Sequence, residues 1–131
     1  MVSPSSLLVV LPTPPSINHQ YATVNGRRVL SAMGRSFKAQ VAQHILLVLA
    51  RSPHRGALLQ TLGSSQLALS IHFFSVSPLR RDVDGGLKIA QDALCEALDL
   101  NDNRIVEIHL HKAQDTANPR MEVSLSSATN L

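Results

Sequence analysis

The sequence predicts a single α+β domain in which a mixed β-sheet carries two main helices, and three observations lead to this fold class. Residues 66–76 alternate apolar and polar side chains, as half-buried strands do. Apolar residues recur at every third or fourth position over 32–50 and over 84–99, as they do in amphipathic helices. The length of 131 residues suits one hydrophobic core but not two, so one domain is expected to span residues 1–131.

The first elements are expected to be a short strand and a hairpin. The run "LLVVLP" at residues 7–12 indicates a buried strand that ends at Pro12, because the three prolines of "PTPPSIN" exclude both helix and regular strand pairing. Asn25 and Gly26 then separate two short β-favouring runs, which is the strongest local signal for a two-residue type I′ turn. The hairpin is either a solubilising loop or a basic finger that reaches for phosphates.

A long helix is expected next. Ser31 is a suitable N-cap for a helix over residues 32–50, which would pack on the core through one apolar face. That face consists of Phe37, Val41, Ile45 and Val48. Residues 51–66 contain Pro, Gly and Ser at intervals, so they are expected to form a surface connection.

The second half supplies the remaining strands. The strand over residues 66–76 ends before Pro78. After the second helix, "RIVEIHLHK" at 104–112 and "RMEVSLS" at 120–126 alternate in the same way and are joined by the short segment "AQDTANP". We expect these two runs to form an antiparallel hairpin.

Charge is divided sharply along the chain. Before Asp82 there are eight Lys and Arg residues and no acidic residue, whereas from Asp82 onward there are four basic and nine acidic residues. The two parts therefore carry +8 and −5, which gives the net charge of +3. This division favours a surface that attracts a polyanion together with a separate carboxylate-rich site, although a solvated basic face is the plainer alternative.

Composition limits the location of the protein. The longest apolar runs, "LLVVL" and "ILLVLA", are far shorter than the roughly 20 residues that span a bilayer. The first residues lack the basic start and the cleavage pattern of a secretory signal. A single cysteine, Cys95, cannot form an intrachain disulfide and suits a reducing cytoplasm. The sequence thus predicts a cytoplasmic protein with no membrane partner.

The stretch "RRDVDGGLKIAQDALCEALDLND" at 80–102 is the best candidate for chemistry. Asp82 and Asp84 can simply cap the second helix and favour its dipole. However, two adjacent glycines near its start cost about 1 kcal/mol each relative to Ala, which suggests that a bulky ligand backbone approaches there. Asp84 and Lys88 have the i,i+4 spacing that places both on one helical face.

Carboxylates, a lysine and flanking arginines are the groups that phosphodiester hydrolysis requires. The carboxylates would hold Mg²⁺, which activates water, and the lysine would stabilise the transition state as a cation. Sugar-nucleotide transferases also use a D-x-D motif, but they need a larger nucleotide-binding domain. His109 and His111, which would share a strand face with Glu107, lack further ligands at suitable spacing and indicate an exposed strand face.

Four segments together resemble the RusA family of Holliday junction resolvases. They are "LPTPPSINHQY" at 11–21, "GRRVLSAMGRSFK" at 26–38, "RRDVDGGLKIAQDAL" at 80–94 and "LNDNRIVEIHLHK" at 100–112. The resemblance implies a RusA-like homodimer that binds four-way DNA junctions and uses Mg²⁺ to nick two strands of like polarity symmetrically, in DNA recombination and repair. It also implies a phage-derived or bacterial source.

Carried over residue by residue, the resemblance implies that Asp82, Asp84 and Asp102 are catalytic carboxylates that bind the metal, and that Lys88 is the catalytic lysine. Many members have Asn where this chain has Gly85, and paired acids where it has Asn101 and Asp102. The phosphate contacts would come from six basic residues. These are Arg27, Arg28, Arg35, Lys38, Arg80 and Arg81. The rival functions are a non-catalytic four-way-junction DNA-binding protein that retains the fold, and an unrelated small domain that binds another acidic partner.

A straight helix over 84–99 would be about 24 Å long, which would place Asp102 at the end opposite to Asp84. Two such helices, paired antiparallel about a two-fold axis, would bring Asp102 of one subunit to the other subunit's Asp82 and Asp84. Their contact would be an apolar seam, which can pack either on the sheet or on a partner helix. The seam is Leu87, Ala90, Leu94 and Leu98. The alternatives are that the loop after the helix folds back, or that the helix begins later.

Overall fold

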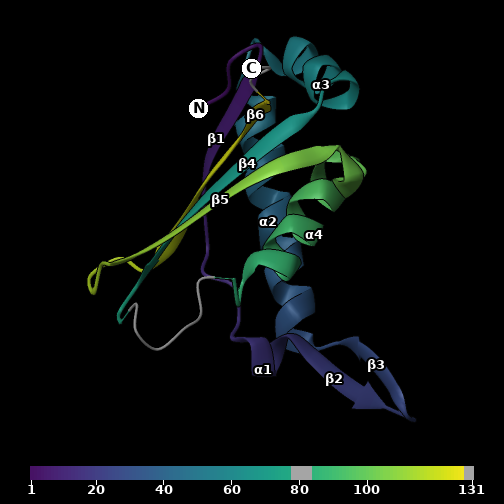
Figure 1. Ribbon diagram of the computed structural model, residues 1–131, viewed down its shortest axis with the longest axis vertical. Helices are drawn as coiled ribbons and strands as arrows, with labels where there is room; N and C mark the ends of the chain where they lie inside the picture. The colour runs from purple at the N-terminus through teal and green to yellow at the C-terminus, as the bar shows by residue number, and fades with distance from the viewer. Residues whose placement is uncertain (78–83, 129–131) are drawn as a thin grey trace.

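A computed structural model describes residues 1–77 and 84–128 of the chain, and its central element is a four-stranded mixed sheet (Figure 1). The strand order is β1-β6-β4-β5. β4 pairs in parallel with β5 and antiparallel with β6, and β1 pairs antiparallel with β6. The strands are β1 (Ser6–Leu11), β4 (Leu67–Ser75), β5 (Ile105–Gln114) and β6 (Arg120–Ser127). The predicted α+β class with a mixed sheet is confirmed.

Two long helices cover one face of this sheet. α2 (Ala32–Ala50) and α4 (Leu87–Leu98) pack against each other and against the sheet, as Figure 1 shows. Shorter elements complete the described chain. These are helix α1 (Ile17–Gln20), helix α3 (Arg55–Ser64), the 3-10 turn η2 (Asp102–Arg104), and the two-stranded sheet of β2 (Tyr21–Val24) and β3 (Arg27–Leu30).

The start of α2 lies where the sequence predicts it. The Ser31 hydroxyl accepts a hydrogen bond of 2.9 Å from the backbone N–H of Gly34, which satisfies one of the free donors of the first turn. Of the predicted apolar face, Phe37, Val41 and Ile45 are fully buried. The face is confirmed, with Leu49 buried in addition and Val48 packed at its margin.

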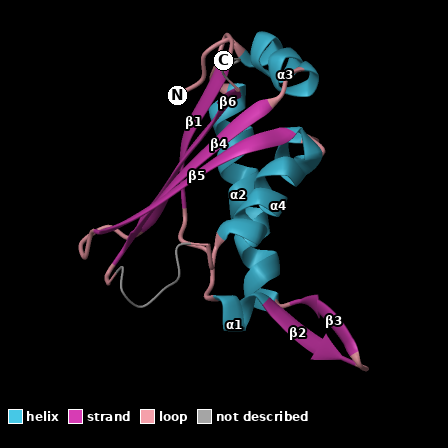
Figure 2. Cartoon of the chain, in the orientation of Figure 1, coloured by secondary structure: helices cyan, strands magenta, loops and turns pink. Residues whose placement is uncertain are grey.

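The predicted hairpin is also confirmed. Asn25 and Gly26 have φ values of 52° and 75°, so both central residues have the positive φ that a type I′ turn requires. The strands pair from Tyr21 with Leu30 to Val24 with Arg27. In Figure 2 this hairpin projects from the helical side of the molecule, away from the main sheet.

The core lies between the main sheet and the helices. Leu67, Leu69 and Ile71 of β4 point inward and are fully buried, which confirms the predicted alternation. On β1, in contrast, Leu8 and Val10 are about half exposed, because they point to the face that lies opposite the helices.

Two expectations about the connections are wrong. Residues 51–66 contain α3, whose Leu58 and Leu62 lie one turn apart and are fully buried, so this segment contributes to the core. The runs at 104–112 and 120–126 form β5 and β6, but β4 lies between them and pairs with both. β6 takes an inner position, and its Met121, Val123 and Leu125 are buried in the core.

The seam expected to face a partner helix belongs to the core of the single chain. Ala90, Leu94 and Leu98 are at most 6% exposed, and Leu87 packs at the margin of the same cluster. Two α4 helices therefore cannot pair through these residues without unfolding the chain. Within 1–77 and 84–128, no helix combines the length and the apolar character needed to cross a membrane.

Candidate active site along helix α4

Asp84 lies in a turn before α4 and not on the helix itself. The helix begins at Leu87, three residues later than expected, and residues 84–86 form a turn in which the Leu87 N–H donates to the Asp84 carbonyl at 3.1 Å. The expectation that Asp84 and Lys88 share a helical face is therefore wrong. Asp84 is the first residue of this turn and is exposed.

The glycine at 86 has a packing role. A Cβ atom there would lie 2.7 Å from Cγ of Pro14 and 3.1 Å from Cε1 of Phe73, and the residue is buried. The idea that this glycine admits a ligand backbone is wrong, because the proline segment and β4 already occupy the space. Gly86 instead lets the chain turn into α4 directly against the core.

Lys88 stands in the first turn of α4 with its side chain 77% exposed. Its Nζ lies 3.6 Å from Oδ2 of Asp92, one turn further along the helix. This separation is longer than a close hydrogen-bonded ion pair. The ammonium group is thus held on the Asp92 side of α4 and remains accessible to a ligand.

Asp102 lies close to the same side of the helix because the chain folds back after α4. Asp99 ends the helix in the left-handed conformation, with φ 54° and ψ 48°, and Leu100 N–H donates to the Cys95 carbonyl at 2.8 Å. Asp102 then begins η2 and lines an open hollow together with Asp92 and residues of the last turns of α4. Asp102 therefore shares this hollow with Asp92, whereas neither Lys88 nor Asp84 lines it.

The acidic residues on this side of α4 affect the pKa of Cys95. Burial, followed by the charges of Asp102, Asp92 and Glu96, raises the pKa of its thiol to about 11. The Cys95 residue is 4% exposed, and its thiol stays protonated at neutral pH, so it is not a nucleophile there. This agrees with the expectation from sequence that Cys95 is a small buried apolar residue.

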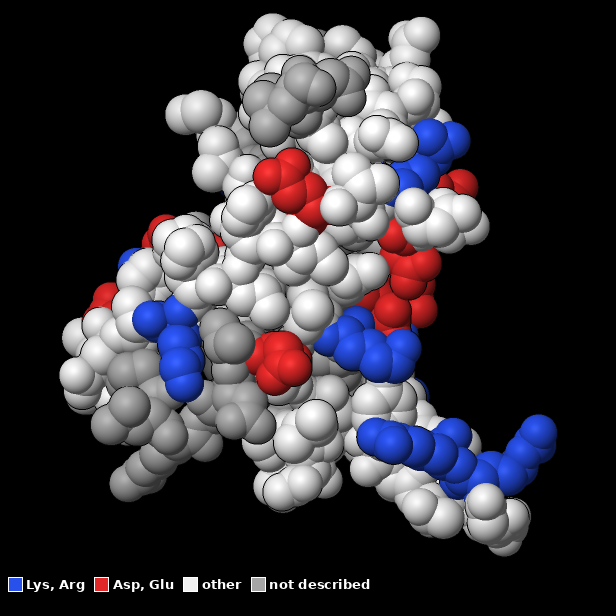
Figure 3. Space-filling model, viewed as in Figure 1, with Lys and Arg blue, Asp and Glu red and all other residues white. Residues whose placement is uncertain are grey.

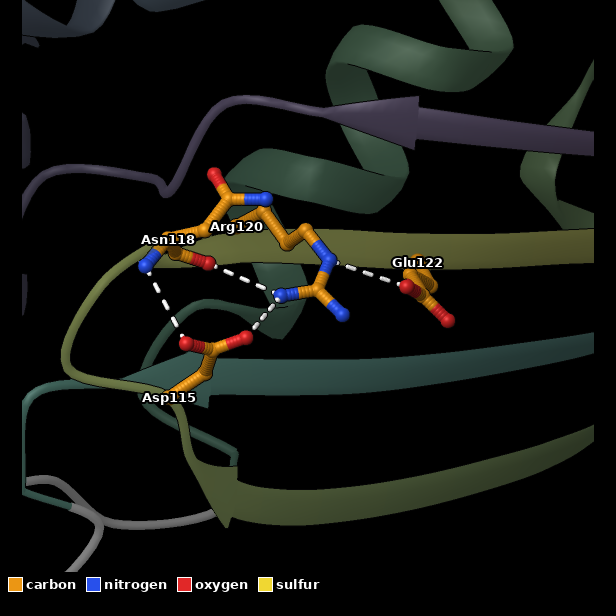
Figure 4. Close-up of polar contacts among 4 residues, drawn as sticks. All are labelled: Asp115, Asn118, Arg120 and Glu122. Atoms are coloured by element: carbon orange, nitrogen blue, oxygen red, sulfur yellow. Dashed lines mark hydrogen bonds and ion pairs between the residues drawn. The ribbon is translucent and has the colours of Figure 1, made fainter.

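The far end of β4 is anchored by a polar network shown in Figure 4. The Arg120 guanidinium lies 2.7 Å from Asp115 Oδ2 and 2.9 Å from Glu122 Oε2, and packs over the ring of Phe74 at 4.1 Å. The backbone N–H of Asp115 donates to the Ser75 carbonyl at 2.9 Å. The network thus holds the last residues of β4, from which the chain leads toward Asp82.

Basic side chains gather on the hairpin and the first part of α2. Arg27 and Arg28 are exposed on β3, and the Arg28 guanidinium lies 4.5 Å from the ring centre of Tyr21. Arg35 donates from Nη1 to the Leu30 carbonyl at 2.8 Å, which ties it to the base of the hairpin. Figure 3 shows Lys and Arg along the projecting hairpin, and Asp and Glu gathered at the edge formed by α4.

Lys38 differs from the other predicted DNA contacts. Its Nζ lies 2.9 Å from Oε1 of Glu96, and its side chain is only 20% exposed. The residue therefore joins α2 to α4. Arg80, Arg81 and Asp82, which complete the predicted set, lie outside the described residues.

The carboxylates of the site have the oxygen chemistry that Mg²⁺ prefers. Among the described residues, no three His, Cys, Asp or Glu side chains are arranged to hold a metal. The predicted metal ligands also include Asp82, which lies in the segment 78–83, outside the described residues.

The histidines of β5 do not belong to this site. His109 pairs with Glu107 at 2.8 Å, and His111 stacks on His72 with ring centres 4.4 Å apart.

One residue near the site gave no signal in the sequence. Gln20 is 2% exposed, and its side-chain amide reaches the backbone carbonyl of Gly85, immediately after Asp84. A glutamine in an irregular segment is indistinguishable from a solvated loop residue by pattern alone. Only the fold brings it to the start of α4, across 65 positions of the chain.

Comparison with known proteins identifies the class of this protein as an endodeoxyribonuclease. The family model of endodeoxyribonuclease RusA matches residues 12–126, and the chain belongs to that family of enzymes, which hydrolyse phosphodiester bonds. It is 28% identical to the crossover junction endodeoxyribonuclease of Enterobacteria phage 82 over 123 residues, and this alignment covers 93% of this chain and 95% of the relative. It is 29% identical, with the same coverage, to the crossover junction endodeoxyribonuclease RusA of Escherichia coli K12.

Proposed function

We propose that the chain is a Mg²⁺-dependent endonuclease that resolves four-way DNA junctions by symmetric nicking of two strands, in recombination and repair. The observation that supports this proposal is that Asp92 pairs with Lys88 and also lines one hollow together with Asp102. The relatives that share almost the full length of the chain are named crossover junction endodeoxyribonucleases and come from a phage and from bacteria. We accordingly place the enzyme in the bacterial cytoplasm.

The residues divide between metal binding and phosphate contact. Asp82, Asp84 and Asp102 would hold the ion with oxygen ligands, and a bound Mg²⁺ supplies an activated water and neutralises phosphate charge. Lys88 is suited to contact the scissile phosphate, because its ammonium is exposed and only loosely paired with Asp92.

DNA would be held chiefly by the hairpin. Arg27 and Arg28 present cations on the projecting hairpin, and Arg35 of α2 lies at its base. Arg80 and Arg81 precede the proposed catalytic aspartates along the chain. Contacts of this kind position the phosphate backbone without reading bases, so binding should weaken steeply with salt. Lys38 contributes less, because its charge is already paired with Glu96.

We propose that the enzyme acts as a homodimer, since two equivalent sites match the two-fold symmetry of a four-way junction. The partner contact must use a surface other than the buried seam of α4. The fold-back of Asp102 favours a site completed within one chain. Mixing Asp84→Asn chains with Asp102→Asn chains tests this, because nicking stays absent if sites are not shared and returns if they are.

The deciding experiment is cleavage of a synthetic four-way junction with and without Mg²⁺. We expect the wild type to nick two strands only with the metal, and Asp84→Asn and Asp102→Asn to bind the junction without nicking it. Asp99→Asn is the matched control, because Asn tolerates the left-handed conformation of that position and should leave nicking intact. Junction binding by the wild type without nicking would contradict catalysis, and a preference for linear duplex would contradict junction specificity.

A further inference from the structure

Gln20 is the one buried polar residue in the described part of the chain, and both N–H groups of its amide are used. Its Nε2 donates to the Pro15 carbonyl and to the Gly85 carbonyl, each at 2.9 Å. Its own backbone carbonyl accepts from the Ser31 N–H at 3.0 Å. One residue therefore connects the proline segment, the cap of α2 and the turn that carries Asp84.

The turn needs such an anchor because of its composition. Gly85 and Gly86 follow Asp84 directly, and two adjacent glycines leave a backbone with wide conformational freedom. The hydrogen bond from Gln20 fixes the orientation of the peptide between these glycines, while Pro14 and Phe73 restrict Gly86 sterically. The exposed Asp84 therefore precedes a glycine turn whose backbone is restrained by contacts with the core.

We infer that Gln20 is a positioning residue, which sets the direction of the Asp84 carboxylate through the Gly85 carbonyl. This inference rests on the proposed function, because it takes Asp84 to be a metal-binding carboxylate. This location requires a side chain that donates hydrogen bonds. Two buried carbonyls face Nε2, so a carboxylate there would place acceptor against acceptor, and an apolar side chain would leave both carbonyls unpaired.

The first test compares Gln20→Met with Gln43→Met, a control at an exposed glutamine of α2. For Gln20→Met we expect kcat on the four-way junction to fall about ten- to a hundredfold, as for a displaced catalytic group. The Mg²⁺ concentration for half-maximal rate should rise, whereas KM and junction binding without metal should stay within about twofold, because no DNA contact changes. Gln43→Met should match the wild type in all four measurements.

The second variant, Gln20→Glu, separates positioning from general loss of stability. A protonated glutamic acid donates one hydrogen bond to the carbonyls, whereas the carboxylate donates none. The kcat of Gln20→Glu, divided by the wild-type value at the same pH, should therefore rise as the pH falls from about 8.5 to about 6, since burial raises a carboxyl pKa. A ratio that does not change with pH would contradict the inference.

A measurement on the wild type covers the case in which the variants do not fold. In NMR spectra of the DNA-free protein, Mg²⁺ titration should shift the side-chain amide signals of Gln20 and leave those of Gln43 unchanged. Unmoved Gln20 signals at saturating Mg²⁺, or unchanged kcat and Mg²⁺ requirement in Gln20→Met, would overturn the inference while wild-type nicking still supported the proposed function. A wild type that does not nick junctions would instead remove the proposed function itself.

Discussion

The Nζ of Lys38 on α2 lies 2.9 Å from Oε1 of Glu96 on α4, so the basic half and the acidic half of the chain meet in one ion pair. The pair bridges the two helices that cover the sheet. It also takes one cation out of the surface that DNA would contact and partly neutralises the flank beside Asp102.

Removal of the negative charge of Glu96, the partner of Lys38, should strengthen DNA binding. In Glu96→Gln, Lys38 is released and one negative charge near the phosphates is lost, so we expect about two- to fivefold tighter junction binding at low salt, the scale of an exposed ion pair. Titration with a labelled junction measures this. Glu107→Gln on β5 makes the same change in net charge, and an equal gain from that control would show that only the total charge matters.

Gly86→Ala should destabilise the protein by about 1–3 kcal/mol, the usual cost of an overpacked core, because its Cβ would meet Pro14 and Phe73. Gly56→Ala in α3 provides the contrast, since a Cβ there meets nothing within 4 Å. That control should gain up to about 1 kcal/mol from helix propensity. Urea denaturation gives both values, and a neutral Gly86→Ala would contradict the packing role of this glycine.

Cys95 should react slowly with iodoacetamide. Its pKa of about 11 leaves little thiolate at pH 8, so the folded protein should be alkylated at least about a hundredfold more slowly than the urea-unfolded chain. Asp102→Asn should accelerate the reaction only in part, because burial is the larger cause of the raised pKa and the Asp102 charge is the next. With EDTA present throughout, an unchanged rate in Asp102→Asn would contradict the fold-back of Asp102.

The Asp115–Arg120 ion pair should stabilise the fold in a pH-dependent manner. The hydrogen bond from Arg120 lowers the pKa of Asp115, so its stabilising effect is present above the pKa of the unfolded chain and is lost as the pH falls through the lower folded value. The free energy of unfolding of Asp115→Asn should therefore lie below that of the wild type by a constant amount above about pH 5. The difference should shrink below about pH 4.

A double-mutant cycle with Arg120→Gln isolates this coupling at each pH. A coupling energy that persists unchanged at about pH 2.5 would contradict its assignment to the ionised Asp115.

The elements that the sequence predicts correctly depend on neighbouring residues. Ser31 caps α2 through a hydrogen bond three residues away, and Asn25 with Gly26 forms its turn without help from the rest of the chain. The sequence does not predict α3, because its two buried leucines lie within a segment that contains several helix-breaking residues.

The errors concern contacts between distant segments. Nothing local shows that β4 separates β5 from β6, that Pro14 fills the space beside Gly86, or that the α4 seam is used within one chain. Residue chemistry points to Asp84 and Lys88, and the family resemblance, which is confirmed, implies Asp102 as well. The position of Asp102 relative to the other two depends on the loop after α4, for which the sequence leaves several conformations open.

The position of β6 bears on how the enzyme is made. β6 is the last strand among the described residues, yet it lies inside the sheet, where it pairs with both β1 and β4. Until residue 127 has left the ribosome, β1 lacks its partner strand and the core lacks Met121, Val123 and Leu125. The sheet and its core therefore cannot be completed before these C-terminal residues have been translated, although β1 is made first.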